Sequence, residues 1–210
     1  MAQRYETRDF TQVPMESLMP GEIVLREEEI QKRVDELAED IAERYRGQKL
    51  MLVGLLKGAS VFMVHMMEAL YKAGCTDFET EYMEVGSRGN NIESSGKIKI
   101  IKDIPAEKLV NKNVLLIDDI ADSLTTFAGV AEHFQPNGLT SFATLSLLEK
   151  PSEHRPDLRG FPLDFVGFKI PNVWVEGYGL DSFEYGRGNP NIVIGPTPGA
   201  LAFKASQQQQ

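Results

Sequence analysis

Residues 114–126 read VLLIDDIADSLTT, where four apolar residues run into two acids and then into a short polar segment. Consecutive apolar residues are typical of a strand that is covered on both faces of a parallel sheet. The hydroxyl residues Ser123, Thr125 and Thr126 lie where the next helix should begin. A strand, a polar loop and a helix in this order place polar side chains at the carboxyl edge of a parallel sheet, where open α/β folds bind ligands.

The flanking sequence also alternates between predicted strands and predicted helices. Short apolar runs predict strands at 50–56, 78–85, 141–148, 164–168 and 191–194, and alternating Lys and Ile predict a half-exposed strand at 97–101. Amphipathic spacing predicts helices at 27–46 and 59–73, the latter with an apolar face of Val61, Val64, Met67 and Leu70, and another helix that ends near Phe134. We therefore expect one α/β domain over residues 1–210, with a central, mostly parallel sheet flanked by helices.

Composition limits the partners and the location. A formal net charge of −9 disfavours nucleic acid and anionic membranes, because both would repel an acidic chain. Cys75 is the single cysteine, which excludes an intramolecular disulfide. No apolar signal segment begins the sequence, so we expect a cytoplasmic protein.

Two segments have little to bury. Residues 86–96 read GSRGNNIESSG, and this Gly-, Asn- and Ser-rich composition predicts a mobile flap. The closing residues 205–210 end in four glutamines, and we expect a disordered tail there.

The acids and hydroxyls of residues 114–126 can do complementary chemistry. Hydroxyl side chains beside the free N–H groups of a helix N-terminus can bind a phosphate with little help from basic residues. Asp118 and Asp119 suit ribose hydroxyls or Mg²⁺ bridged by water. The plainer alternative is that the acids are solvated and that Asp122 and Ser123 only cap the helix. That alternative does not explain three clustered acids after an apolar run.

The same residues resemble the phosphoribosyl pyrophosphate-binding motif of type I phosphoribosyltransferases. Four further segments narrow the resemblance to hypoxanthine-guanine phosphoribosyltransferases, over about residues 23–204. These are Leu56-Lys57-Gly58-Ala59, Leu147-Leu148-Glu149-Lys150, the stretch Asp164–Asp181, and Glu184-Tyr185-Gly186-Arg187.

The resemblance implies a fold and a set of roles. The fold is the type I phosphoribosyltransferase fold, with a small hood from the terminal segments. Asp118, Asp119, Asp122, Ser123, Leu124, Thr125 and Thr126 would bind the ribose and its 5′-phosphate. Pyrophosphate would contact Lys57, Gly58, Ser87, Arg88 and Arg187, with an unusual peptide geometry at the Leu-Lys-Gly loop. The purine would contact Lys150, Val173, Trp174, Val175 and Asp181. Mg²⁺ would be held by Asp181, with Asp118 and Asp119 as further candidates.

The implied reaction transfers phosphoribosyl from phosphoribosyl pyrophosphate to N9 of a 6-oxopurine. Asp122 would be the general base near purine N7. Lys150 would donate to the 6-oxo group, and since an ammonium cannot accept a hydrogen bond, it disfavours adenine. The resemblance also implies a homodimer or homotetramer. The choice among hypoxanthine, guanine and xanthine is not fixed by these residues.

Two positions depart from the family pattern. Leu124 stands where a glycine or another small residue is usual, and a leucine side chain restricts close approach and positive φ. The flap has Ser87-Arg88 where the family usually has Ser-Tyr, so the arginine either reaches pyrophosphate directly or marks a lid that closes less well.

Two alternatives follow from these residues. Leu124 keeps open a non-catalytic phosphoribosyltransferase-fold protein that senses nucleotide and regulates a partner, although a complete set of catalytic groups disfavours it. An unrelated dinucleotide-binding oxidoreductase is disfavoured, because no Gly-x-Gly-x-x-Gly follows a strand.

Overall fold

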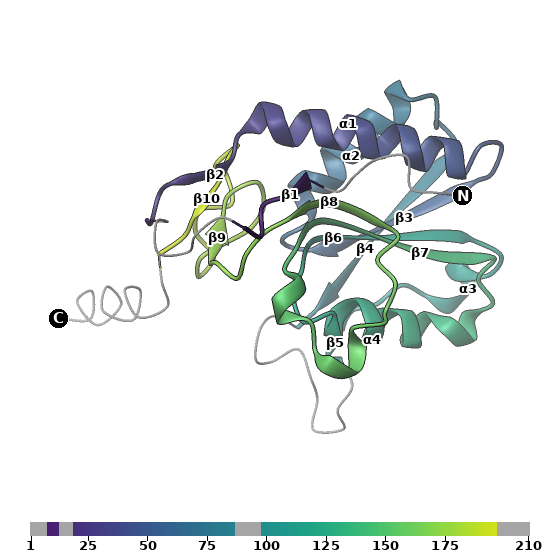
Figure 1. Cartoon of the computed structure of the whole chain (residues 1–210). Coiled ribbons are helices and arrows are strands. Elements are labelled where there is room, and N and C mark those ends of the chain that lie inside the picture. The colour runs from purple at the N-terminus through teal and green to yellow at the C-terminus, as the bar shows by residue number, and fades with distance from the viewer. Residues whose placement is uncertain (1–7, 13–18, 87–97, 197–210) are drawn as a thin grey trace.

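The computed structural model describes residues 8–12, 19–86 and 98–196, which form a seven-stranded sheet, a three-stranded sheet and flanking helices (Figure 1). The predicted tail and the predicted flap, apart from Gly86, lie outside these residues. In the described part of the chain, no helix is both long and apolar enough to cross a membrane.

The larger sheet has the strand order β1-β8-β7-β6-β3-β4-β5. All neighbours in it are parallel except β4 and β5. Its strands are β1 (Arg8–Asp9), β3 (Leu50–Leu56), β4 (Phe78–Val85), β5 (Ile100–Lys102), β6 (Asn113–Ala121), β7 (Ser141–Glu149) and β8 (Phe165–Lys169). The sheet confirms the predicted α/β class, and β1 is an edge strand that the sequence did not predict.

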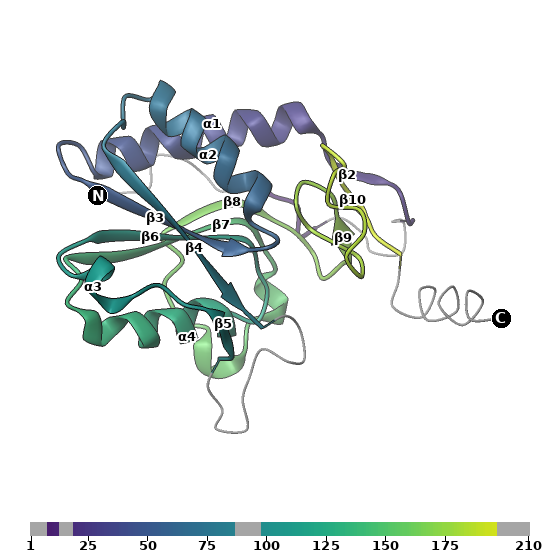
Figure 2. The same cartoon turned by 180° about the vertical axis from the view of Figure 1, so that it is seen from behind.

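Helices cover both faces of this sheet. Figures 1 and 2 show α1 (Glu27–Arg44) and α2 (Ser60–Lys72) on one face, and α3 (Ala106–Leu109) and α4 (Thr125–Phe134) on the other. Successive side chains of a strand point to opposite faces. Leu52 accordingly packs with the α1 and α2 residues, whereas Val53 packs with Phe127 of α4. Both faces are apolar because both are covered, which explains the continuous apolar run at 50–56.

The smaller sheet forms the hood. It comprises β2 (Ile23–Leu25), β10 (Ile192–Ile194) and β9 (Val175–Glu176), which pair antiparallel in the order β2-β10-β9. The prediction that 191–194 continues the main alternation was wrong. β10 is a strand, but its partners come from the segments before α1 and after β8.

Two predicted boundaries also change. The strand predicted to end in the two acids continues to Ala121, because Ile120 and Ala121 still pair with β7. Asp118 and Asp119 therefore lie before the end of the strand. The strand predicted at 97–101 is shorter and begins at Ile100.

The apolar face predicted for α2 was partly wrong. Val64 is 44% exposed, whereas the buried side chains of the helix are Phe62, Met63, Met66, Ala69 and Leu70. The physical reason is that α2 contacts both the sheet and α1, so its buried surface is wider and rotated from a single stripe.

Candidate active site

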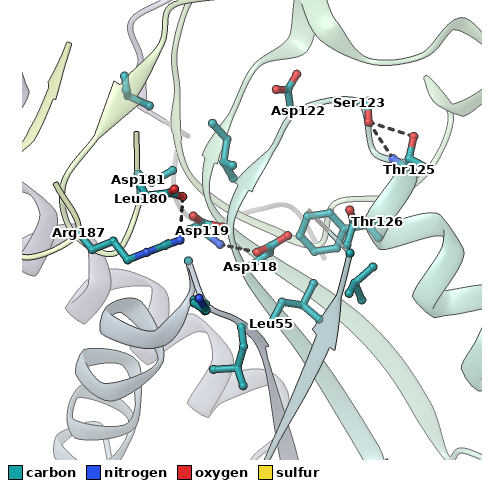
Figure 3. Close-up of a pocket in the computed structure, with 18 of the residues that line it drawn as sticks. Leu55, Asp118, Asp119, Asp122, Ser123, Thr125, Thr126, Leu180, Asp181 and Arg187 are labelled. Carbon is teal, nitrogen blue, oxygen red and sulfur yellow. Dashed lines mark hydrogen bonds and ion pairs between the residues drawn. The ribbon is translucent and has the colours of Figure 1, made fainter. Parts of the chain in front are cut away.

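A cavity of about 820 Å³ lies between the carboxyl ends of β3 and β6 and the loop that follows β9 (Figure 3). Its wall contains most of the residues that the sequence analysis selected, from segments far apart in the chain. These are Lys57, Gly58, Asp118, Asp119, Asp122, Ser123, Leu124, Thr125, Thr126, Trp174, Val175, Asp181 and Arg187.

Asp118 and Asp119 are adjacent, half-buried carboxylates at the end of β6. Asp118 Oδ1 accepts a hydrogen bond of 3.0 Å from the Asp119 amide. Burial raises the pKa of both carboxyl groups, and for Asp118 the neighbouring Asp119 charge raises the pKa further. Position 58 requires a glycine, because a Cβ there would lie 2.1 Å from Asp119 Oδ2. The loop after β3 thus packs directly on the acid pair.

The loop between β6 and α4 presents hydroxyls at a helix N-terminus. Ser123 Oγ donates to Thr125 Oγ1 at 3.0 Å and accepts from the Thr125 amide at 3.4 Å. Thr125 is the first residue of α4, so the free N–H groups of its first turn face the same region. Such N–H groups bind anions well.

Leu124 connects this loop to α4 with its side chain turned inward. Its φ is +66°, the left-handed conformation that glycine adopts freely. Its side chain is 2% exposed and packs in the cluster that contains Phe127 and Val130. The leucine therefore reaches the backbone conformation that glycine would supply, and most of its side chain lies in the core.

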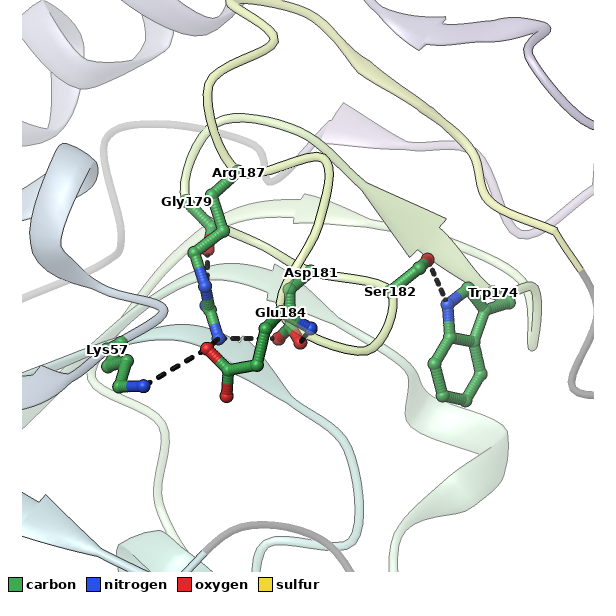
Figure 4. A network of polar contacts seen from close by, with 7 residues as sticks. All are labelled: Lys57, Trp174, Gly179, Asp181, Ser182, Glu184 and Arg187. Atoms are coloured by element: carbon green, nitrogen blue, oxygen red, sulfur yellow. Dashed lines mark hydrogen bonds and ion pairs between the residues drawn. The ribbon is translucent and has the colours of Figure 1, made fainter. Parts of the chain in front are cut away.

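The opposite wall carries two cations. Lys57 follows a cis peptide bond at Leu56–Lys57, the unusual geometry expected for this loop, and its Nζ donates to Glu184 Oε2 at 3.1 Å. Arg187 donates to the Gly179 carbonyl at 2.7 Å and lies 2.9 Å from Asp181 Oδ1 (Figure 4). Among the described residues, Arg187 Nε is buried without a hydrogen-bond partner, so the guanidinium keeps an unused donor.

The hood contributes an aromatic surface. Trp174 Nε1 donates to Ser182 Oγ at 2.8 Å, which fixes the indole at the rim. The Phe183 ring lies 6.4 Å from the Trp174 ring, with the two planes 21° apart. Trp174, Val175 and Phe183 all line the cavity. A planar base could stack on such a surface.

Two of the predicted site residues that the structure describes, Lys150 and Val173, are not in the cavity wall. Lys150 follows β7 and is 4% exposed, and its amide donates to the Ala121 carbonyl at 2.9 Å. Val173 directly precedes Trp174 of the cavity wall in the sequence. Ser87 and Arg88 lie outside the described residues.

The cavity also contains residues to which the sequence analysis gave no role. These are Leu55, Leu56, Val85, Gly86, Ile120, Phe127, Glu153, Leu180, Phe183 and Glu184. Most are apolar residues whose identity carries no functional signal. Glu153 and Glu184 are charged, and Glu184 lies within the motif that was already selected for Arg187.

The acids fit a metal that arrives with a phosphorylated substrate. Within the described ranges, no three His, Cys, Asp or Glu residues form a ready metal cluster. Mg²⁺ usually takes one or two carboxylates and completes its shell with substrate phosphates and water. Asp181 faces the cavity and its side chain is 32% exposed, so its carboxylate can supply such a ligand.

The comparisons with known proteins agree with this geometry. Residues 21–183 match the phosphoribosyl transferase domain family, and the chain belongs to that family. The hypoxanthine-guanine phosphoribosyltransferase of Bacillus subtilis is 37% identical over 172 residues, which cover 82% of this chain and 91% of the relative. That of Aquifex aeolicus is also 37% identical, over 82% of this chain and 93% of its own.

Solved structures give the same family. The hypoxanthine phosphoribosyl transferase of Trypanosoma cruzi has a TM-score of 0.78 at 28% identity and covers 94% of this chain and 100% of its own. A hypoxanthine phosphoribosyltransferase of Staphylococcus aureus has a TM-score of 0.74 at 34% identity, with coverages of 86% and 94%. The predicted resemblance and the predicted type I fold are therefore confirmed.

Proposed function

We propose that this protein is a purine salvage enzyme that transfers 5-phosphoribosyl from phosphoribosyl pyrophosphate to N9 of hypoxanthine or guanine. The products would be IMP or GMP and pyrophosphate. The observation that carries the proposal is that one cavity combines an acid pair, a hydroxyl-rich helix N-terminus, two cations and an aromatic surface. Each of these suits a different part of the two substrates, and the family membership gives the reaction.

The donor would lie along the floor of the cavity. Its 5′-phosphate would accept hydrogen bonds from Ser123, Thr125, Thr126 and the first turn of α4. Its ribose hydroxyls would donate to Asp118 and Asp119, since an ionised carboxylate is an acceptor. Its pyrophosphate would lie between Lys57 and Arg187, the two cations of the opposite wall.

The base would lie against the hood. Trp174 would stack on the purine, and such stacking contributes about 1–3 kcal/mol. The backbone at Val173 and Val175 would read the base edge. Lys150 would donate to the 6-oxo group from its position after β7, which requires its buried ammonium to turn toward the base.

The chemical step forms the bond from N9 to the anomeric carbon and breaks the bond from that carbon to pyrophosphate, whose oxygen keeps the electron pair. Asp122 would accept the purine proton at N7 as N9 attacks. Positive charge that develops on the ribose would be stabilised by Asp118 and Asp119, and negative charge on pyrophosphate by Lys57 and Arg187. Mg²⁺, when bound at Asp181, would add a cation beside the leaving group.

The sensor alternative gains no support from the structure. It rested on Leu124, and that side chain is buried in the core. With the enzyme function we propose a single catalytic domain in a cytoplasmic homodimer or homotetramer, following the family resemblance.

A spectrophotometric assay tests the function. Phosphoribosyl pyrophosphate and Mg²⁺ are supplied with hypoxanthine, guanine, xanthine or adenine in turn. Turnover is expected with hypoxanthine, guanine or both. Absence of turnover with every 6-oxopurine would overturn the enzyme proposal, whereas turnover with adenine would overturn only the role of Lys150.

A further inference from the structure

The loop between Asp181 and Arg187 contains an unusual turn. Ser182 and Tyr185 exchange both backbone hydrogen bonds, at 2.9 and 3.2 Å. The two residues between them have positive φ, +56° at Phe183 and +71° at Glu184. Positive φ at both central residues defines a type I′ turn, which favours Asn and Gly. Phe and Glu at these positions are strained, and such strain usually marks a functional constraint.

The turn aims the Glu184 carboxylate at the two cations of the cavity (Figure 4). Its Oε2 accepts from Lys57 Nζ at 3.1 Å and lies 3.5 Å from an Arg187 nitrogen. Its amide donates to Asp181 Oδ2 at 2.7 Å, which fixes the turn. The hydrogen bond from Lys57 lowers the pKa of the Glu184 carboxyl group, so Glu184 is ionised at neutral pH.

The charges on this wall therefore cancel. Lys57 and Arg187 carry two positive charges, and Asp181 and Glu184 carry two negative ones. Glu184 pairs with both cations, and Arg187 also pairs with Asp181. A polyanion attracted to the cations must compete with an anion that already accepts their hydrogen bonds. Mutual cancellation at short range reduces the field that a ligand meets.

We propose that Glu184 sets the affinity of this site for pyrophosphate, because its carboxylate occupies Lys57 and Arg187 and must release them before the ligand binds. The inference rests on the proposed function of these two cations. It makes Glu184 an internal competitor of the leaving group. A bound divalent cation would offset part of its charge, so the competition is strongest when little Mg²⁺ is present.

Glu184 can be changed without loss of the fold. The Glu184 and Lys57 side chains are 65% and 59% exposed, and exposed ion pairs stabilise folded proteins little. Glu184→Gln removes the charge at nearly constant size. Glu184→Asn removes it with a residue that tolerates left-handed backbone, so any shared effect comes from the charge and not from the turn.

The test is calorimetric titration of the purified protein with inorganic pyrophosphate, at low and high Mg²⁺. We expect both variants to bind pyrophosphate about two- to fivefold more tightly than wild type, the scale of an exposed ion pair. The gain should be larger at low Mg²⁺ and should shrink at high salt, where exposed charges are screened.

Glu153→Gln is the matched control. Glu153 lines the same cavity, and its carboxylate accepts from Ser152 at 3.4 Å, away from the contacts of Lys57. This change removes the same charge without freeing either cation, so its gain should be clearly smaller. An equal gain would overturn the proposal, because it would reflect only net charge.

Unchanged or weaker pyrophosphate binding in both Glu184 variants would also overturn the proposal for Glu184. Absence of pyrophosphate binding in the wild type and the variants alike would overturn it too. The outcome is separable from the proposed function. A protein that binds pyrophosphate but shows no turnover with any 6-oxopurine would refute the enzyme function, while the affinity difference would still test Glu184.

Discussion

The backbone at Leu124 adopts a conformation that costs an L-residue roughly 1–2 kcal/mol relative to the right-handed form. Its buried side chain offsets that cost through contacts with Phe127 and its neighbours. The glycine-like geometry of the loop is thus obtained with a residue that also stabilises α4. From the sequence, this leucine was expected to restrict the close approach of a phosphate. Neither its φ nor the direction of its side chain could be predicted.

Leu124→Gly tests this balance. Removal of a buried leucine costs roughly 2–5 kcal/mol, and relief of the left-handed strain returns about 1–2 kcal/mol. The free energy of unfolding, measured in urea, should therefore fall by up to about 4 kcal/mol. Leu124→Ala should be less stable still, because it keeps a Cβ at positive φ. A glycine variant more stable than wild type would contradict this balance.

Asp122 is the residue on which the proposed proton transfer depends. General acid–base groups contribute roughly 10²–10⁴-fold to rate, so Asp122→Asn should lower kcat by about that factor. Nucleotide affinity, measured by calorimetry, should change much less, since asparagine keeps the size and one acceptor. An unchanged kcat would remove Asp122 as the general base.

The acid pair gives a prediction about pH. Because the folded protein raises the pKa of Asp118, it binds a proton there more readily than the unfolded chain does. Stability should therefore decrease as pH rises from the ordinary carboxyl range through the raised pKa. Asp118→Asn removes this penalty. Its Tm should exceed that of wild type at neutral pH, and the difference should vanish in acid. A lower Tm at neutral pH would show that the charge is stabilised, not penalised.

The loop that follows β3 and the loop that follows β9 meet at one point. A Cβ at Gly179, whose φ is +98°, would lie 2.1 Å from the Gly58 carbonyl oxygen. Next to it, Tyr178 is buried, and its hydroxyl lies 2.7 Å from His65 Nδ1 of α2. The hood loop is therefore held against the loop that follows β3, and their contact brings Arg187 and Lys57 to the same wall.

Gly179→Ala should separate these loops. A displacement of about 1 Å can cost roughly 10²-fold in rate, so kcat/KM for phosphoribosyl pyrophosphate should fall by about that factor. Gly188→Ala is the control in the same loop, because a Cβ there meets nothing within 4 Å. Steady-state kinetics on both variants check the prediction. Equal effects would mean that the contact between the loops is unimportant.

The central elements were predictable because each carries a local signal. β3 and β6 are continuous apolar runs, and α1 has a strong three- and four-residue period. The hood was not predictable at the level of strand pairing. β9 has two residues and β10 three, too few to show a period, and their pairing depends on chain segments far apart. The rotated face of α2 likewise depends on a neighbour, α1.

Over the whole molecule, the site was predictable where motifs are contiguous. The run from Asp118 to Thr126 lines the cavity as expected, because it is one strand end and one helix start. Phe183 and Glu184 acquire their positions through a turn whose positive φ values no local signal predicts. The burial of Lys150 is set by the packing around β7, which the sequence did not reveal.

The proposed reaction in this cavity joins a base to a phosphoribosyl group and releases pyrophosphate. The most direct measurement follows hypoxanthine and phosphoribosyl pyrophosphate through one incubation with Mg²⁺ and quantifies both products by chromatography. We expect the wild-type protein to form IMP and pyrophosphate in equal amounts, and Asp122→Asn to form both much more slowly. Binding of phosphoribosyl pyrophosphate without formation of IMP from hypoxanthine or of GMP from guanine would contradict the proposed reaction.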